Sequence, residues 1–420
     1  MFDLIFKELL GIDYIIVSEN EEYEIRYSEL NEDGEHLFIP LISHLLFSKG
    51  FHPFEVPYRN TGPDTELFPS DGVNGPWNFD LFSSVFYLVS RYEEYEGFTP
   101  DAHHRFPPTA SILHKTNSFE FPLVNLWVQK LKKVIQNKYP EITFKEPKFR
   151  FVSTIDIDST FQFCEKGLWW SLSGLAKDLA KGKYPDALSR LKTLTGIQND
   201  AFNVYDEMDC FHKKYGTEVL FFFLLGDYAP FDKNIPWKNK KQAHIIKTLN
   251  ETYSVGIHPS YASNYKEGQL EKEVKRMETI TGTKQTMSRQ HFIIHSFPKT
   301  YQKLVSTGIK ADFSMGYTSQ YGFRAGIAAP FYFFDLEKEM ATDLLLYPFC
   351  SMDITPLHYY KISPEQAMEK NRDLLKKVKD VNGLFISLWH NESISGALRW
   401  KGDWPKVYFQ LLKDAAEMEE

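Results

Sequence analysis

From residue 149 onward, short apolar runs alternate with longer amphipathic stretches. This alternation is typical of repeated βα units, in which helices cover a parallel sheet or barrel. Strands are predicted at 149–155, 217–225, 253–257, 284–290, 308–311 and 383–389. Helices are predicted between them at 200–214, 236–250, 266–280, 298–307 and 363–379. A long helical stretch at 165–195 is interpreted as an insertion over the top of the barrel, where it could shape a substrate groove.

The first part of the chain has a different pattern. Short alternating runs and Pro- and Gly-rich stretches precede helical patterns at 81–95 and 122–138. The polar segment 139–148 carries two prolines and predicts a domain boundary. Because 420 residues exceed the length of chain that a single hydrophobic core usually supports, we expect two domains. These are an α+β domain at 1–148, with no chemistry that the sequence identifies, and an α/β domain of the (β/α) barrel type at 149–420.

Composition and charge narrow the class of function. An apolar fraction of 43% and 16% aromatic residues exclude a disordered chain. The net charge of -8 argues against a nucleic-acid-binding or anionic-membrane surface, since phosphate groups are bound through clustered Lys and Arg. A neutral substrate such as a sugar fits this charge better.

The sequence predicts a cytoplasmic protein. The apolar N-terminus is interrupted by charges such as Asp3 and Lys7 and has no basic leader region. No stretch approaches the roughly 20 apolar residues of a membrane-spanning helix. The three cysteines are odd in number and widely spaced, which favours free thiols in a reducing compartment.

The residues most able to do chemistry lie at the carboxyl ends of the predicted strands. In α/β barrels catalytic groups collect at that face, because the loops vary there while the strands hold the groups in place. The residues at these positions are Asp156, Asp158, His258, His291, Asp312 and His390.

Asp156 and Asp158 are separated by one residue, so along a strand their side chains point the same way. Two carboxylates that close favour a bound cation. The alternative interpretation of this pair is an exposed turn. For a lone histidine the alternative interpretation is a structural role. His258 follows the next strand but one and supplies an imidazole, which with a carboxylate suits zinc and similar ions. His390 could donate a proton to a leaving amine near neutral pH, or simply cap the barrel rim.

Together these residues resemble the motifs of the polysaccharide deacetylases of carbohydrate esterase family four, over about 149–395. The resemblance implies a distorted β/α barrel and a metal-dependent active site. It implies that Asp156 is the general base, Asp158 and His258 are metal ligands, and His390 is the general acid. Arg289, in the stretch 288–291, would orient the base.

The resemblance also places Asp312 near the general acid. The chain departs from the family at Ala262, where a second metal-binding histidine is usual. His291 is the candidate for the missing ligand, and Ser263 and His295 are weaker candidates.

The implied reaction is hydrolysis of an acetyl group on an amino sugar or polysaccharide precursor. N-acetyl is the preferred substrate group and O-acetyl the second possibility. The implied cofactor is a divalent metal, with Zn²⁺ as the preferred ion. The missing histidine leaves open a catalytically silent barrel that binds glycan or acts as a scaffold in polysaccharide biosynthesis. A glycoside hydrolase would need a second acid flanking the glycosidic bond, and the sequence does not identify one.

Several other notable residues are not part of this set of candidate site residues. Arg324 could enter the site or stabilise a loop. The stretches 91–95 and 103–105 are interpreted as structural ion pairs or a contact between the two domains. Four tryptophans could stack on sugar rings or belong to the core: Trp169, Trp170, Trp400 and Trp404.

Overall fold

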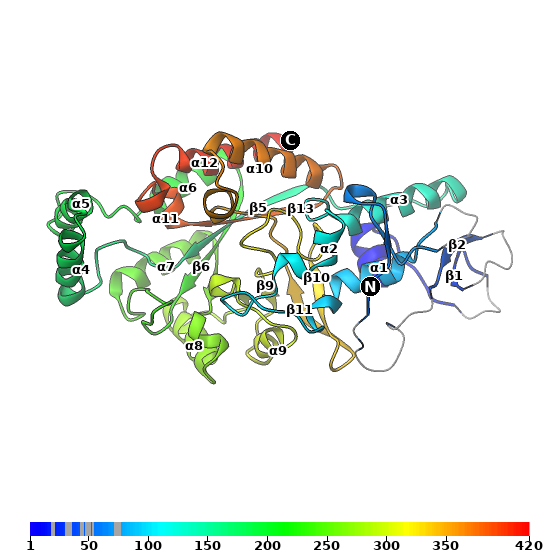
Figure 1. The fold of residues 1–420 in the computed structure, drawn as a ribbon, viewed down its shortest axis with the longest axis horizontal. Helices are drawn as coiled ribbons and strands as arrows, with labels where there is room; N and C mark the ends of the chain where they lie inside the picture. Colours follow the sequence, from blue (N-terminus) through cyan, green and yellow to red (C-terminus); the bar gives the residue numbers. More distant parts are fainter. Residues whose placement is uncertain are drawn as a thin grey trace.

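A nine-stranded sheet forms the centre of the computed structural model (Figure 1). The structure describes residues 1–17, 22–29, 36–42, 46, 52, 54–70 and 77–419. The strand order is β10-β11-β9-β8-β7-β6-β5-β13-β12, and neighbours are parallel except for the antiparallel pair β10 and β11. No pairing joins the edge strands β10 and β12 within the described ranges, so the sheet is a curled, open half-barrel. The α/β class is thereby confirmed.

All six predicted strands are present. They are β5 (Arg150–Ile157), β6 (Glu218–Leu224), β7 (Ser254–His258), β8 (Met287–Ser288), β9 (Ala311–Asp312) and β13 (Leu384–His390). Three further strands were not predicted: β10 (Phe331–Asp335), β11 (Met340–Leu346) and β12 (Ser351–Met352). β11 is largely exposed along its first half and β12 has two residues, so neither produces the buried apolar run that marks the other strands.

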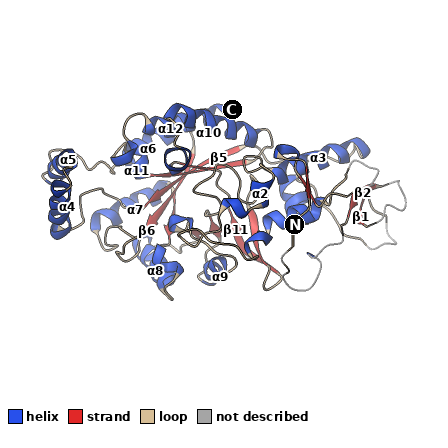
Figure 2. Ribbon diagram, viewed as in Figure 1, coloured by secondary structure: helices blue, strands red, loops and turns tan. Residues whose placement is uncertain are grey.

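The predicted helices of this region are also present. They are α6 (Tyr205–Tyr215), α7 (Lys240–Thr252), α8 (Gln269–Thr281), α9 (Lys299–Ser306) and α10 (Pro364–Lys379). α10 begins with a capping box formed by Ser363 and Gln366. Helix α12 (Trp404–Glu419) was not predicted, and it packs against α10 along one side of the sheet (Figure 2).

The predicted helical stretch at 165–195 is two helices, α4 (Leu168–Ala180) and α5 (Tyr184–Leu194). The chain turns between them at Gly182, whose φ of 67° suits glycine. The pair projects from one end of the molecule instead of lying over the sheet (Figure 1). The expected insertion is therefore a protruding hairpin.

The described residues of the N-terminal part contain short strands and three α-helices, of which α2 is a single turn. The strands are β1 (Ile25–Ser28), β2 (Leu37–Pro40), β3 (Tyr58–Arg59) and β4 (Glu66–Leu67), and the helices are α1 (Leu81–Val89), α2 (Ile112–Lys115) and α3 (Leu123–Lys138). The helical patterns at 81–95 and 122–138 are confirmed, although α1 ends at Val89. None of the helices in the described parts of the chain has the length and apolarity needed to cross a lipid bilayer.

Residues on both sides of position 148 pack into one hydrophobic cluster. Within it, Glu94 lies between two buried arginines: Arg91 Nε is 2.7 Å from its Oε1, and Arg324 Nε is 2.8 Å from the same atom. Burial opposes ionisation of Glu94, but the two arginines outweigh it and lower its pKa to about 2. The interpretation of 91–95 as structural ion pairs is confirmed, and Arg324 belongs to them. The division of the chain at 148 stays a prediction.

Candidate metal centre

The two aspartates predicted at the end of the first barrel strand point toward the same histidine. β5 is buried along nearly its whole length, and its partner strands β6 and β13 are parallel to it. His258 is the last residue of β7. Its Nε2 lies 3.3 Å from Asp158 Oδ1 and 3.8 Å from Asp156 Oδ2. The expectation that Asp156 and Asp158 share one side is confirmed.

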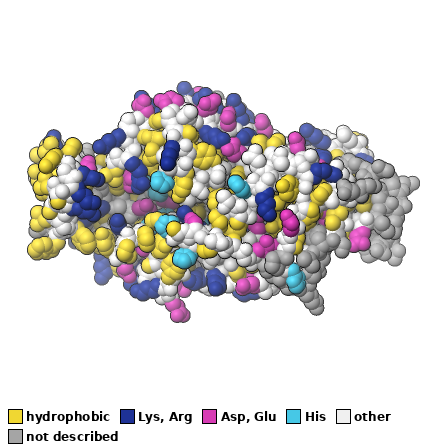
Figure 3. Space-filling model, in the orientation of Figure 1, with side chains coloured by type: hydrophobic (Ala, Val, Ile, Leu, Met, Phe, Trp, Pro, Cys, Tyr) yellow, Lys and Arg dark blue, Asp and Glu magenta, His cyan; other side chains and the backbone are white. Residues whose placement is uncertain are grey.

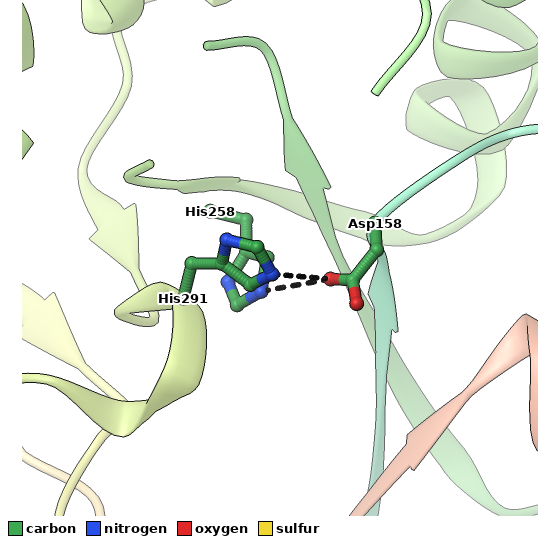
Figure 4. A group of neighbouring side chains, drawn as sticks. All are labelled: Asp158, His258 and His291. Carbon is green, nitrogen blue, oxygen red and sulfur yellow. Dashed lines mark ion pairs between the residues drawn. The ribbon is translucent and has the colours of Figure 1, made fainter. Parts of the chain in front are cut away.

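His291 completes a group of three possible metal ligands. It lies in a 3-10 turn, His291–Ile293, just after β8, and its Nε2 is 3.4 Å from Asp158 Oδ1. Figure 4 shows both imidazoles directed at this one carboxylate oxygen. One ligand atom from each of the three residues lies within 4.8 Å of the others.

The hydrogen bonds leave lone pairs directed into the centre. His258 Nδ1 is 2.5 Å from the backbone oxygen of Arg289, so this nitrogen carries the proton and Nε2 carries the lone pair. His258 Nε2 and Asp158 Oδ1 are both buried without a hydrogen-bond partner. A buried carboxylate oxygen facing an imidazole lone pair is unfavourable without a cation between them. These donors fit a divalent ion of the zinc type.

Asp232 holds the imidazole of His291 in place, and the sequence did not reveal this role. Its Oδ1 is 3.0 Å from His291 Nδ1, an arrangement that orients metal-binding histidines in many proteins. The backbone N–H groups of Tyr261 and Ala262 donate to the same carboxylate, at 2.7 and 3.1 Å. Burial would lower the pKa of His291, but Asp158 and Asp232 outweigh it and raise the pKa to about 9.

The weaker candidates for the third ligand lie outside this group. The hydroxyl of Ser263 donates to the backbone oxygen of Ser260 at 2.6 Å. The ring of His295 packs against Phe297 and Tyr301. Of the three candidates, the structure brings only His291 to Asp158 and His258.

Arg289 lies beside Asp156, as the resemblance implied. The guanidinium is fully buried, and its Nη1 is 3.3 Å from Asp156 Oδ1 and 2.5 Å from the hydroxyl of Thr154. Its Nε donates to the backbone oxygen of Phe313 at 2.9 Å. These bonds keep a positive charge next to Asp156.

His390, at the end of β13, is paired with Asp353. Its Nδ1 lies 3.0 Å from Asp353 Oδ2. Burial would lower the pKa of His390, but the carboxylates of Asp353, Asp158 and Asp156 outweigh it and raise the pKa to about 10. His390 therefore carries a proton at neutral pH in this environment. Asp353 was missed, although it too follows a strand, the two-residue β12.

The carboxylate that pairs with the proposed general acid His390 is Asp353. The placement of Asp312 near the general acid, which the resemblance implied, stays a prediction. Asp312 accepts hydrogen bonds from the hydroxyls of Ser288 and Ser314, at 2.8 and 3.1 Å. Burial raises its pKa to about 6.

Two residues mark the opening of the centre. The side chain of Asp158 is 44% exposed and that of His390 is 19% exposed, whereas those of Asp156, His258 and His291 are at most 6% exposed. Because Oδ1 of Asp158 is buried, its exposure comes from the rest of the side chain. Asp158 and His390 are therefore the members of this group of side chains that solvent reaches.

Aromatic rings and residues of the N-terminal part flank the centre. Phe231 and Tyr261 stack with ring centroids 4.4 Å apart, and Phe231 is 46% exposed. His103 packs against Phe292, and Arg105 donates to the backbone oxygen of Phe292 at 2.9 Å. The interpretation of 103–105 as a contact between the two parts of the chain is confirmed.

The four tryptophans divide into two groups. Trp400 and Trp404 are buried, as expected for core residues. Trp169 and Trp170 are exposed on α4, and Trp170 lies against the exposed ring of Tyr228.

Comparisons with known proteins were made for the whole chain. A family of unknown function, DUF7033, matches residues 1–140, which is a third of the chain. No curated protein matches the sequence.

Several solved structures are similar to part of the chain. A protein of Mycobacterium smegmatis named as a polysaccharide deacetylase is 12% identical, with a TM-score of 0.40 over 66% of this chain and 86% of that one. A polysaccharide deacetylase of Bacillus cereus is 13% identical, with a TM-score of 0.31 over 64% and 87%. A mutant of a CE4 family pseudoenzyme with restored enzymatic activity is 14% identical, with a TM-score of 0.29 over 64% and 63%. At these TM-scores the likeness carries no weight for function, which has to be inferred from the site itself.

Proposed function

We propose that this chain is a metal-dependent hydrolase that removes an acetyl group, N-acetyl in the first place, from an amino sugar or polysaccharide precursor. One observation carries the proposal: Asp158, His258 and His291 converge, with a buried carboxylate oxygen and an imidazole lone pair that have no hydrogen-bond partner. The reaction type also rests on the resemblance of the surrounding residues to deacetylase motifs.

Asp158, His258 and His291 would hold the metal. One carboxylate and two imidazoles favour Zn²⁺ among the common divalent ions, and the solvent-exposed side of Asp158 leaves room for a water and a substrate. A divalent ion there would polarise the acetyl carbonyl and lower the pKa of a bound water.

Asp156 is proposed as the general base. Its carboxylate would take a proton from the attacking water as the water oxygen bonds to the acetyl carbon. Arg289 would hold Asp156 in position, because its buried guanidinium lies 3.3 Å from the carboxylate. The buried carboxylate of Asp312 interacts with the charge on Arg289 and would help to hold this guanidinium in place.

His390 is proposed as the general acid. Asp353 binds its Nδ1, which leaves Nε2 to donate a proton to the sugar nitrogen as the carbon–nitrogen bond breaks. The products are acetate and a free amino sugar. The raised pKa of His390 supports this role, because a general acid must carry its proton before the reaction.

The aromatic rings beside the centre support a sugar substrate. Phe231 and Tyr261 stack on each other beside Asp232, and the 46% exposed ring of Phe231 offers an apolar surface of the kind that suits sugar rings. The silent-barrel alternative is not favoured, because its basis was the missing histidine at Ala262 and His291 occupies the centre in its place.

Metal content of the purified protein tests the proposal. Wild type should bind close to one equivalent of Zn²⁺ by mass spectrometry, and His258→Ala and His291→Ala should each lose most of it. His244→Ala is the matched control, because His244 is an exposed histidine on α7 and should leave the metal content unchanged. A wild-type protein that holds no metal after reconstitution would exclude the proposed centre.

Activity is tested separately with N-acetylated amino sugars and their oligomers. Acetate release by the metal-loaded protein, lost in Asp156→Asn at unchanged metal content, would support the assigned base. A fully loaded protein that releases acetate from no N- or O-acetylated sugar would contradict the hydrolase proposal while leaving the metal centre intact.

A further inference from the structure

The hairpin formed by α4 and α5 exposes an unusual number of large apolar side chains. Trp169 and Tyr184 are 84% and 68% exposed, and Ile197, three residues after the end of α5, is 75% exposed. The other exposed members of this set are Trp170, Leu172, Leu179, Leu188, Leu191 and Leu194. Most of them recur at helical spacing: positions 169, 172 and 179 share one face of α4, and positions 184, 188, 191 and 194 share one face of α5.

The side on which the two helices pack together is small and polar. Arg190 of α5 forms an ion pair with Asp178 of α4, with Nε 2.9 Å from Oδ2. Gly174 allows this approach, because a Cβ there would lie 2.7 Å from the guanidinium. Helices of soluble proteins normally bury the apolar stripe and expose the polar one. In this hairpin the arrangement is reversed, which marks the outer face as a surface that contacts something apolar.

The hairpin also differs in charge from the rest of the molecule. Residues 168–194 carry five basic and two acidic side chains, in a chain with a net charge of -8. Arg190 is neutralised by Asp178, and four exposed lysines remain: Lys177, Lys181, Lys183 and Lys192. Figure 3 shows hydrophobic side chains gathered at this end of the molecule, with Lys and Arg side chains next to them.

At the base of the hairpin, the segment before α4 is held to the segment after α5. The carboxylate of Asp200 accepts hydrogen bonds from the backbone N–H groups of Gln162, Phe163 and Cys164, at 2.7, 2.8 and 3.0 Å. The guanidinium of Arg190 lies over the ring of Phe163, 4.4 Å from its centroid. Because this base follows directly after β5, the hairpin stands at the edge of the sheet where the metal centre lies.

We propose that the α4–α5 hairpin is a docking surface for an anionic lipid membrane. Exposed tryptophan, tyrosine and leucine side chains flanked by lysines match the interface of a bilayer with acidic headgroups. A helix of 13 residues, about 20 Å long at 1.5 Å per residue, is too short to cross a bilayer and suits insertion along its surface.

Charge decides between the possible occupants of this surface. A second copy of the chain would bring the same four lysines together, and their repulsion opposes self-association. An anionic lipid surface attracts them. The net negative charge of the whole chain argued against binding to such a surface, but the hairpin itself carries a net positive charge.

Vesicle co-sedimentation of the full-length protein tests this proposal. Wild type should sediment with phosphatidylglycerol vesicles and bind phosphatidylcholine vesicles at least about 10-fold more weakly, with binding that falls as salt is added. Two variants should each lose about 10-fold or more in binding: Trp169→Ser with Leu172→Ser and Leu188→Ser, and Lys177→Glu with Lys181→Glu, Lys183→Glu and Lys192→Glu. Tyr332→Ser with Met340→Ser is the matched control, because these two side chains are exposed on β10 and β11 and should not matter.

Three results would overturn the proposal. The first is a wild-type protein that stays in the supernatant with both kinds of vesicle. The second is a pair of hairpin variants that bind as tightly as wild type. The third is a wild-type dimer by light scattering that the serine variant converts to a monomer, which would assign the hairpin to a second copy. The test needs neither metal nor substrate, so it stands apart from the proposed hydrolase activity.

Discussion

The backbone N–H of Ala262 lies 3.1 Å from Oδ2 of Asp232, the carboxylate that also binds Nδ1 of His291. Position 262 therefore contributes to the centre although its side chain carries no ligand. Together with the N–H of Tyr261, it fixes Asp232, and Asp232 fixes the imidazole. In the proposed centre, the ligand that is missing at position 262 would be supplied by His291, from the neighbouring loop after β8.

We expect Asp232→Asn to weaken metal binding by about 10- to 100-fold, the usual effect of removing a partner that orients a metal-binding histidine. The amide removes the negative charge beside His291 and presents an N–H₂ group to backbone donors that need an acceptor. Competition with a chelator of known affinity measures the change. Asp227→Asn is the control, since this carboxylate follows the same strand β6 but pairs with Lys272 on the surface. Equal metal affinity in wild type and Asp232→Asn would mean that His291 is not held through this carboxylate.

His390→Gln should lower kcat for acetate release by about 10²- to 10⁴-fold, the range for loss of a general acid or base, while the metal content stays close to that of wild type. Turnover and metal content should respond differently because His390 is not among the three proposed metal ligands, and its Nδ1 contacts Asp353. Paired measurements of metal content and turnover test it. Parallel loss of both quantities would show that His390 supports the metal centre instead of the leaving group.

Arg105→Gln should lower metal affinity by about 10-fold, the lower end of the effect of groups that support a metal ligand. Phe292 and Ile293, directly after His291, have positive φ angles of 58° and 55°, which are unfavourable for residues with a Cβ. Arg105 donates to the backbone oxygen of Phe292 and is itself held by Asp101 at 2.7 Å. Without this donor the turn can relax and move the imidazole.

The chelator competition described for Asp232→Asn also measures the effect of Arg105→Gln. Arg372→Gln is its control, because Arg372 on α10 forms a comparable ion pair with Asp414 on α12. An unchanged metal affinity in Arg105→Gln would show that the sheet region holds His291 without the N-terminal part.

The residues predicted for the centre share one feature, which is a position next to the end of a buried parallel strand. Asp156, Asp158, His258 and His390 could be placed from the sequence because β5, β7 and β13 produce clear apolar runs. Parallel strands bring their carboxyl ends to one edge of a sheet, so proximity follows from the strand pattern. Asp353 has the same kind of position, but a two-residue strand leaves no run to read.

Other features of the structure could not be predicted because they depend on contacts between distant segments. Asp232 lies in a loop without periodicity and acquires its role only when the loops at 261–262 and 291 fold around it. Arg324 and Glu94 are separated by 230 positions, so the regular periodicity of a strand or helix cannot predict their contact. The hairpin α4–α5 was predicted as helix, yet its projection from the molecule depends on where its base is anchored.

The buried imidazole of His212 should make the stability of the fold depend on pH. Its Nε2 lies 2.7 Å from the hydroxyl of Tyr408 and its Nδ1 lies 2.8 Å from the hydroxyl of Thr217. Burial lowers its pKa to about 4, against about 6.5 for a histidine in an unfolded chain. Between these two values the unfolded chain binds a proton that the folded protein does not bind. The contribution of His212 to the free energy of unfolding is therefore complete above pH 6.5 and is lost as the pH falls toward 4.

Comparison of wild type with His212→Gln isolates this contribution, because glutamine keeps polar atoms near both hydroxyls and does not titrate. Urea unfolding at several pH values between 7 and 4.5 should show a steeper loss of stability in wild type, approaching about 3 kcal/mol over the full window. His244→Gln, at an exposed position on α7, should follow the wild-type curve. Parallel curves for wild type and His212→Gln would mean that the buried imidazole accepts a proton without cost, and that the hydroxyls of Tyr408 and Thr217 can reorient to accept hydrogen bonds from the charged ring.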